Sequence, residues 1–200
     1  MVKRGALPKY SLHHLLWALF LISENARVGR KRLAKLMGIG EGTCRGVLRE
    51  LDDRGLVSVS KSGISLSMRG KRMMSGLPAV HGELGLGPLA LSTCGHGVAI
   101  RDHARFVKSG LEQRDAAMLA GAVGATALVF DRGALRFPDG RKLEDDYEAD
   151  AALLVHLFKP LEGDVLIIGY GRDAVSAESG AFAAAATLVF AMCEAADRLL

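Results

Sequence analysis

Apolar residues in the first part of the chain recur at the three- and four-residue spacing of amphipathic helices. This spacing predicts a first helix that Ser11 caps, a short helix at residues 30–37 that ends at Gly38, and a third helix at residues 41–54. The third helix has one apolar face, made of Cys44, Val47, Leu48 and Leu51. Its other face is polar, so this helix is expected to have a core side and a side open to a partner.

Two short segments with alternating apolar and polar residues follow the third helix. They predict strands at residues 56–60 and 64–67, joined by a turn at residues 61–63. Ser67 then caps a basic helical segment. Three helices followed by a two-stranded wing is the order of a winged helix-turn-helix.

Glycine and proline separate this part from the remainder, because six of them occur in the thirteen residues 76–88. We therefore expect a first domain at residues 1–76, a linker at 77–93 and a second domain at 94–200.

The second domain is predicted to follow the order βαββαβ, with an extra helix at its C-terminal end. The expected strands are 98–101, 125–130, 134–137 and 164–169, and the expected helices are 111–123, 144–158 and 176–199. This order is that of a ferredoxin-like antiparallel sheet with two helices on one face. The expected fold is thus α+β, with an N-terminal winged helix-turn-helix and a C-terminal ferredoxin-like domain.

Charge is divided unequally between the two parts. Residues 1–75 contain fifteen Lys or Arg and five Asp or Glu, a net charge of +10, whereas the remaining residues have a net charge of −6. A basic excess confined to one domain is expected where that domain binds a polyanion. Because a helix fits the major groove of B-form DNA, double-stranded DNA is the predicted partner.

The polar face of the third helix supplies candidates for reading DNA. Arg45 and Arg49 can each bond a guanine edge through two donors, and Thr43 can contact a base edge or a phosphate. Gly42 and Gly46 each cost about 1 kcal/mol inside a helix relative to alanine. Two glycines one turn apart indicate that DNA, or alternatively another helix, approaches the backbone closely.

The second helix and the wing supply further candidates. Arg30, Lys31 and Arg32 open the second helix, where they would clamp a phosphate or, alternatively, form a solvated basic turn. Lys61, at the turn of the wing, would reach a neighbouring groove or the DNA backbone. The alternative is an ordinary exposed hairpin lysine.

The sequence from residue 28 to residue 73 resembles the winged-helix domain of many archaeal and bacterial regulators. Such domains have an EG(S/T)xR start of the reader helix and an LTxxG turn after the wing. The corresponding residues here are Glu41-Gly42-Thr43-Cys44-Arg45 and Leu66-Ser67-Met68-Arg69-Gly70. The order of segments beyond the wing resembles an archaeal family of winged-helix proteins whose C-terminal domain has no assigned function. This resemblance implies a regulator whose second domain senses a ligand or dimerises.

Two features of the second domain are candidates for binding a small effector. The first is the glycine-bearing loop at residues 169–180, where Gly169 and Gly171 would present free amides to an anion and Arg172 would assist. The alternative is an ordinary turn between a strand and a helix. The second is Arg114, which would line a ligand pocket or, alternatively, form a surface ion pair with Asp115.

Metal-binding residue types also occur in this part, namely Cys94, His96 and His103, with His81 upstream. Their irregular spacing favours scattered polar residues, so we expect no metal and no cofactor. The sequence has no nucleophile elbow, zinc-protease motif or phosphate-binding loop. We therefore expect that the protein is not an enzyme.

The location of the protein is predicted from its cysteines and its apolar runs. Three widely spaced cysteines favour a reducing cytoplasm. The apolar runs at residues 15–22 and 181–193 are shorter than the roughly 20 residues that cross a bilayer, so no membrane partner is expected.

Taken together, these features predict a homodimeric transcription regulator that binds DNA, with a C-terminal domain for dimerisation and a candidate small-molecule effector. The leading alternative is an enzyme acting on a metabolite, which the winged helix tethers to DNA or autoregulates. A third interpretation is a module that binds protein or RNA, which the basic reader face makes less favourable.

Overall fold

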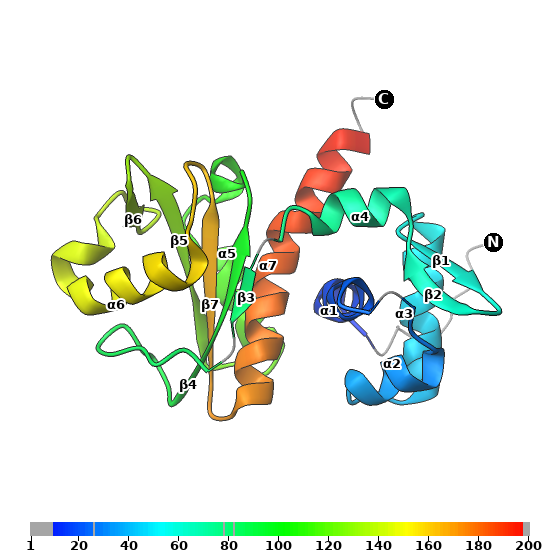
Figure 1. The fold of residues 1–200 in the computed structure, drawn as a ribbon. Coiled ribbons are helices and arrows are strands. Elements are labelled where there is room, and N and C mark those ends of the chain that lie inside the picture. The colour runs from blue at the N-terminus through cyan, green and yellow to red at the C-terminus, as the bar shows by residue number, and fades with distance from the viewer. Residues whose placement is uncertain (1–9, 26, 78, 82, 198–200) are drawn as a thin grey trace, which may run out of the picture. The chain divides into compact units, whose positions relative to one another are not determined.

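The computed structural model describes residues 10–25, 27–77, 79–81 and 83–197. The chain divides into two compact units, Met1–Met74 and Ser75–Leu200 (Figure 1).

The N-terminal unit consists of helices and one hairpin. Its helices are α1 (Leu12–Ser23), α2 (Arg30–Leu36), α3 (Glu41–Asp53) and α4 (Met68–Met74), and its hairpin consists of β1 (Val57–Ser60) and β2 (Gly63–Leu66). The first three helices meet in a core that includes the fully buried Leu16, Leu19, Leu33, Val47 and Leu51. The predicted order of three helices, a hairpin and a fourth helix is therefore observed.

Glycine and serine act at two ends of these helices as the sequence predicts. Gly38 follows α2 with φ +64°, the left-handed conformation that a glycine adopts readily after a helix. Ser67 precedes α4, and its Oγ accepts a hydrogen bond from the Gly70 N–H at 3.0 Å. Gly70 itself is required by packing, since a Cβ there would lie 2.0 Å from the carbonyl oxygen of Leu56.

The C-terminal unit is built on a five-stranded antiparallel sheet. Its strands are β3 (Ala79–His81), β4 (Cys94–Ile100), β5 (Gly124–Asp131), β6 (Ala134–Arg136) and β7 (Val165–Gly171), in the spatial order β3-β4-β7-β5-β6. Its helices are a short 3₁₀ turn (Ala104–Phe106), α5 (Leu111–Leu119), α6 (Leu143–Phe158) and α7 (Ala174–Asp197).

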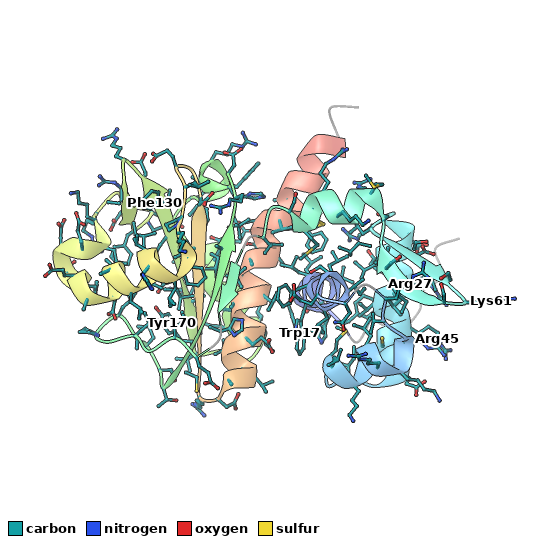
Figure 2. All side chains as sticks on the ribbon, in the orientation of Figure 1. Trp17, Arg27, Arg45, Lys61, Phe130 and Tyr170 are labelled. Atoms are coloured by element: carbon teal, nitrogen blue, oxygen red, sulfur yellow. The ribbon has the colours of Figure 1, made fainter. Side chains whose placement is uncertain are left out.

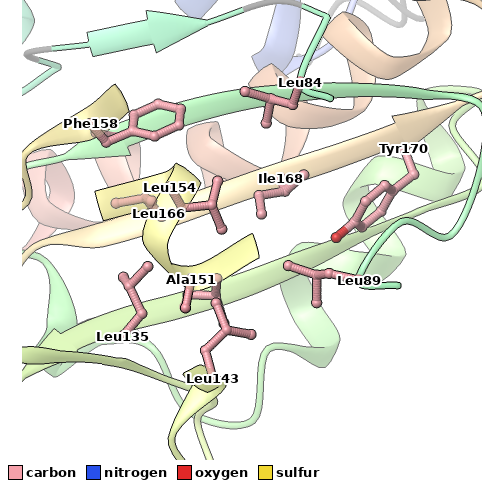
Figure 3. Packing of buried hydrophobic residues seen from close by; sticks show 12 residues of the cluster. Leu84, Leu89, Leu135, Leu143, Ala151, Leu154, Phe158, Leu166, Ile168 and Tyr170 are labelled. Atoms are coloured by element: carbon pink, nitrogen blue, oxygen red, sulfur yellow. The ribbon is translucent and has the colours of Figure 1, made fainter. Parts of the chain in front are cut away.

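Helices cover both faces of this sheet (Figure 1). On one face, α6 packs its apolar side onto alternate residues of β7. Figure 3 shows Leu154 of this helix beside Leu166 of the strand, with Leu143 and Phe158 in the same buried cluster. On the other face, α7 packs against β4 and β7, and α5 packs against α7 and β5. The unit is thus a three-layered α+β structure.

The ferredoxin-like arrangement expected for this unit is wrong. The last strand in sequence, β7, lies in the centre of the sheet between β4 and β5. In addition, α5 and α6 lie on opposite faces, whereas the expected arrangement has both on one face. The physical reason is that α7 occupies the face of β4 and β7, so α6 buries its apolar side against the opposite face. The order of segments along a chain does not by itself determine which strands pair.

The segment expected as a linker, residues 77–93, belongs to the C-terminal unit. It contains β3, and its Leu84 and Leu89 are buried in the core that α6 covers. The buried carboxylate of Asp150 on α6 holds this segment, accepting hydrogen bonds from the N–H groups of Gly87 (2.5 Å) and Leu89 (2.8 Å). The described part of this segment is therefore an ordered loop of the C-terminal unit rather than a spacer.

One helix among the described residues is long and apolar enough to cross a membrane, within Ala174–Ala191 of α7. It extends beyond the apolar run identified in the sequence. Most of it is buried, and it packs on the sheet and on α5. These contacts make α7 a core helix of the C-terminal unit in this structure.

Candidate nucleic-acid interface

A groove of about 500 Å³ lies between the start of α2, the outer face of α3 and the β1–β2 hairpin. Four basic side chains line it, namely Arg30, Arg45, Arg49 and Lys61, together with the acidic Asp52. We refer to it as the basic groove. Figure 2 shows Arg45 projecting from α3 and Lys61 at the tip of the hairpin. Tertiary folding thus brings residues from three separate elements to one surface.

The two faces of α3 explain how this groove forms. Cys44, Val47, Leu48 and Leu51 are buried in the core, so the opposite face of the helix points outward. Arg45 and Arg49 lie one turn apart and are both exposed, while Thr43 is half-buried. The predicted division of this helix into a core side and an open side is confirmed.

The two glycines of α3 have different surroundings. Gly42 is exposed, and a Cβ added there would meet nothing within 4 Å. Gly46 is half-buried, and a Cβ there would lie 2.6 Å from Cε1 of the Tyr10 ring. The close approach expected at Gly46 is therefore made by a side chain of the same unit, and Gly42 alone leaves open space beside the helix backbone.

The basic start of α2 contributes one residue to the basic groove. Arg30, Lys31 and Arg32 are all exposed, but only Arg30 is among the residues that line the groove. The backbone carbonyl of Arg30 also lies 3.7 Å from Sγ of the buried Cys44 on α3. Burial raises the pKa of this thiol, so Cys44 acts as an apolar core residue between the two helices.

Arg27 lies in the break between the first two helices, and no sequence pattern there predicts its role. Its Nη1 donates a hydrogen bond to Oγ of Ser62 at 2.6 Å, at the turn of the hairpin. The adjacent Val28 forms two backbone hydrogen bonds with Ile64 of β2, at 2.9 and 3.1 Å. This segment thus holds the hairpin, and with it Lys61, against the helices.

In the C-terminal unit, Gly169 and Gly171 serve packing. A Cβ on Gly169 would lie 2.3 Å from the backbone nitrogen of Ala181, and one on Gly171 would lie 2.3 Å from that of Ala177. Both glycines are buried beneath α7. The absence of a side chain lets this helix approach β7 closely, and no room remains beside these two residues for a ligand.

The start of α7 is already capped from within the chain. Oδ1 of Asp173 accepts a hydrogen bond from the Ser176 N–H at 2.7 Å, which lowers the pKa of that carboxyl. This carboxylate occupies the place predicted for a bound anion. Arg172 is exposed and lines a cavity of about 510 Å³ with residues at the end of α5. The structure does not bring Gly169, Gly171 and Arg172 together around an open anion site.

Arg114 lies on the exposed side of α5. Its guanidinium pairs with the Asp115 carboxylate at 2.9 Å, and the two side chains are 50% and 60% exposed. This arrangement is the surface ion pair that was the alternative interpretation for Arg114.

The candidate metal ligands Cys94, His96 and His103 do not come together at one site. No group of three or more His, Cys, Asp or Glu able to hold a metal ion occurs among the described residues. Cys94 and His96 line a cavity of about 390 Å³ with Glu83 and Glu178, and burial raises the pKa of the Glu178 carboxyl. His103 is buried elsewhere, with Nδ1 against the Arg101 carbonyl oxygen. The side chain of His81 lies outside the described residues.

Comparisons with known proteins agree with this division of the chain. Residues 18–80 match the model of the CggR N-terminal DNA binding domain, and residues 91–188 match a domain of unknown function (DUF4443). A solved structure of a hypothetical protein from Pyrococcus horikoshii OT3 is similar over 90% of this chain and 93% of its own, with a TM-score of 0.62 and 25% sequence identity. No curated protein matches the chain. The basic groove thus lies in a region similar to a DNA-binding domain, which supports DNA as a partner.

Proposed function

We propose that this protein is a transcription regulator that binds double-stranded DNA through a winged helix-turn-helix. In this proposal α3 is the reader helix and the β1–β2 hairpin is the wing. The observation that carries the proposal is the basic groove, in which Arg30, Arg45, Arg49 and Lys61 gather from three elements onto one surface. The match of residues 18–80 to a DNA-binding domain supports it independently.

The geometry suggests a division of labour within the basic groove. With α3 in the major groove, Arg45 and Arg49 would face base edges or the phosphates beside them. The phosphate backbone would run between α3 and the wing, where Arg30 and Lys61 would neutralise its charge. Arg27 would then be a positioning residue, since its hydrogen bond to Ser62 holds the wing turn next to Lys61.

The test is duplex-DNA binding by the full chain and by an Arg45→Ala/Arg49→Ala variant over a salt series. Random duplexes are compared with fragments from upstream of the protein's own gene. Removing one cation that neutralises a phosphate should lower the slope of log K against log salt by about 0.9. We expect a slope reduced by up to about 1.8 and no remaining preference for the upstream fragment.

The matched control is Lys108→Ala/Arg132→Ala, which removes two cations from the C-terminal unit. It should leave both the slope and the preference unchanged. Absence of binding at low salt by the unmodified chain, or equal binding by the Arg45→Ala/Arg49→Ala variant, would refute the proposal.

We further propose that the C-terminal unit dimerises the chain and binds a small effector. The cavity beside Cys94 and His96 supports the second part, because it is open and contains the half-buried Glu178. Among the described residues, its lining includes two carboxylates and no Lys or Arg, which favours a ligand with a positive charge. A melting-temperature screen with small amines tests this, with Glu178→Gln as the variant expected to lose the stabilisation.

Both units are proposed to act by binding rather than by catalysis. Turnover in a screen of metabolites would instead favour the enzyme interpretation. Competition by RNA that exceeds competition by duplex DNA would favour an RNA-binding module.

A further inference from the structure

The outer side of α5 carries four exposed residues in a single row. Leu111, Arg114, Asp115 and Met118 are spaced at i, i+3, i+4 and i+7, which places them on one face of the helix. Leu111 is 52% exposed and Met118 is 53% exposed. The opposite side of the helix contains the buried Gln113 and Ala117. We call these four residues the α5 stripe.

The order of residues in the α5 stripe is self-complementary. Its two ends are apolar, and its centre holds one positive and one negative side chain. If a second copy of the helix lies antiparallel across it, Leu111 faces Met118 of the copy and Arg114 faces Asp115 of the copy. The same two pairs recur on the other side of the two-fold axis, as an isologous interface requires.

We propose that α5 is a homodimer interface, in which the α5 stripe packs antiparallel against the same stripe of a second copy of this chain. This inference rests on the homodimer of the proposed function and names its surface. Charge complementarity favours a second copy of this chain as the partner, because Arg114 of one stripe faces Asp115 of the other. The apolar ends then bury each other at both sides of the ion pairs.

The ion pair within one chain does not oppose this arrangement. Arg114 and Asp115 pair at 2.9 Å on an open surface, where such a pair contributes little to stability. Replacing this pair by Arg114–Asp115 pairs between the two chains therefore costs little free energy. Leu119, which is 91% exposed, and Val123, which is 41% exposed, follow the α5 stripe along the chain and add apolar surface at this end of the helix.

The experiment measures the dimer dissociation constant of the full chain by sedimentation equilibrium. Arg114→Asp should place two Asp residues opposite each other, and Asp115→Arg should place two Arg residues opposite each other. Each single change should raise the dissociation constant by about tenfold or more, since facing like charges repel. The double variant Arg114→Asp/Asp115→Arg restores opposite charges across the axis and should return the constant close to its original value.

Met118→Asp provides a second test at the apolar end and should also shift the chain to the monomer. The control is Val155→Ser, an exposed apolar position on α6, which should leave the constant unchanged. Circular dichroism and melting temperature verify that each variant is folded. A monomeric unmodified chain, or a dimer that the two single charge changes and Met118→Asp all leave unchanged, would overturn the inference.

Duplex-DNA binding at low salt is measured on the same samples. A monomer retains the basic groove and is expected to bind DNA more weakly. Failure of the unmodified dimer to bind DNA would instead refute the proposed function while leaving the interface intact, so the two failures are distinguishable.

Discussion

Gly42 offers a way to separate the stability of α3 from its contact with DNA. It lies in the first turn of the helix, is exposed, and has nothing within 4 Å of the position a Cβ would take. The Gly42→Ala variant should therefore fold without strain. Because alanine favours helix over glycine, we expect the free energy of unfolding of the unbound protein to increase by about 0.5 kcal/mol. For a unit of this size, that gain raises the unfolding midpoint by about 2–4 °C.

The same methyl group should weaken DNA binding. If a phosphate or a base edge approaches the backbone at Gly42, the added carbon holds it away and lengthens its hydrogen bonds. We expect the dissociation constant for duplex DNA to rise about tenfold, equivalent to about 1.4 kcal/mol. The variant would thus be more stable and yet bind less tightly, a combination that general damage to the fold cannot produce.

The assay pairs thermal unfolding with duplex binding at one salt concentration. Gly85→Ala is the matched control, because Gly85 is an exposed glycine of the C-terminal unit with nothing within 4 Å of its Cβ position. Gly46→Ala is a less suitable variant, since its Cβ would meet the Tyr10 ring. A Gly42→Ala variant that is stabilised and binds DNA as tightly as before would refute a close approach of DNA at this position.

Two further predictions concern stability. Gly169→Ala would place a Cβ 2.3 Å from the backbone nitrogen of Ala181. We expect this variant to destabilise the C-terminal unit by about 1–3 kcal/mol, measured by urea unfolding. An unchanged urea midpoint would contradict the close packing of α7 on β7. Burial, together with the neighbouring His14, lowers the pKa of His13 from 6.5 to about 4. The unfolded chain therefore binds more protons than the folded chain between these values, so stability should fall as the pH decreases from 6.5 towards 4. The melting temperature should be less sensitive to pH over this range in His13→Gln, and equal sensitivity in both proteins would show that this imidazole is not the cause.

Local patterns were sufficient to predict most of the elements and to name the four basic residues of the groove as candidates. The three-and-four spacing of apolar residues predicts α1, α2 and α3 because a helix must turn one face to the core. The same spacing identifies Arg45 and Arg49 as outward-facing residues. Gly38 and Ser67 were predictable as helix-end residues because their roles depend on the backbone within a few residues of them.

The remaining features depend on neighbours that are distant in the chain. Arg27 lies 35 residues before Ser62, and nothing near either residue indicates their hydrogen bond. Gly46 looks the same as Gly42 in the sequence, and only the position of the Tyr10 ring distinguishes them. The loop glycines Gly169 and Gly171 resemble an anion site until α7 is placed against β7.

The sequence by itself determined the helical N-terminal unit, its basic charge and the residues that α3 turns outward, because helix periodicity, end capping and charge are local properties. Only the tertiary structure decided that β7 lies in the centre of its sheet, that α5 and α6 cover opposite faces, and that Arg30, Arg45, Arg49 and Lys61 line one groove. Strand pairing and the meeting of distant side chains are settled by which packing buries the most apolar surface with its hydrogen bonds satisfied. This packing depends on contacts between segments that are distant in the chain, so the sequence of a single segment does not predict it.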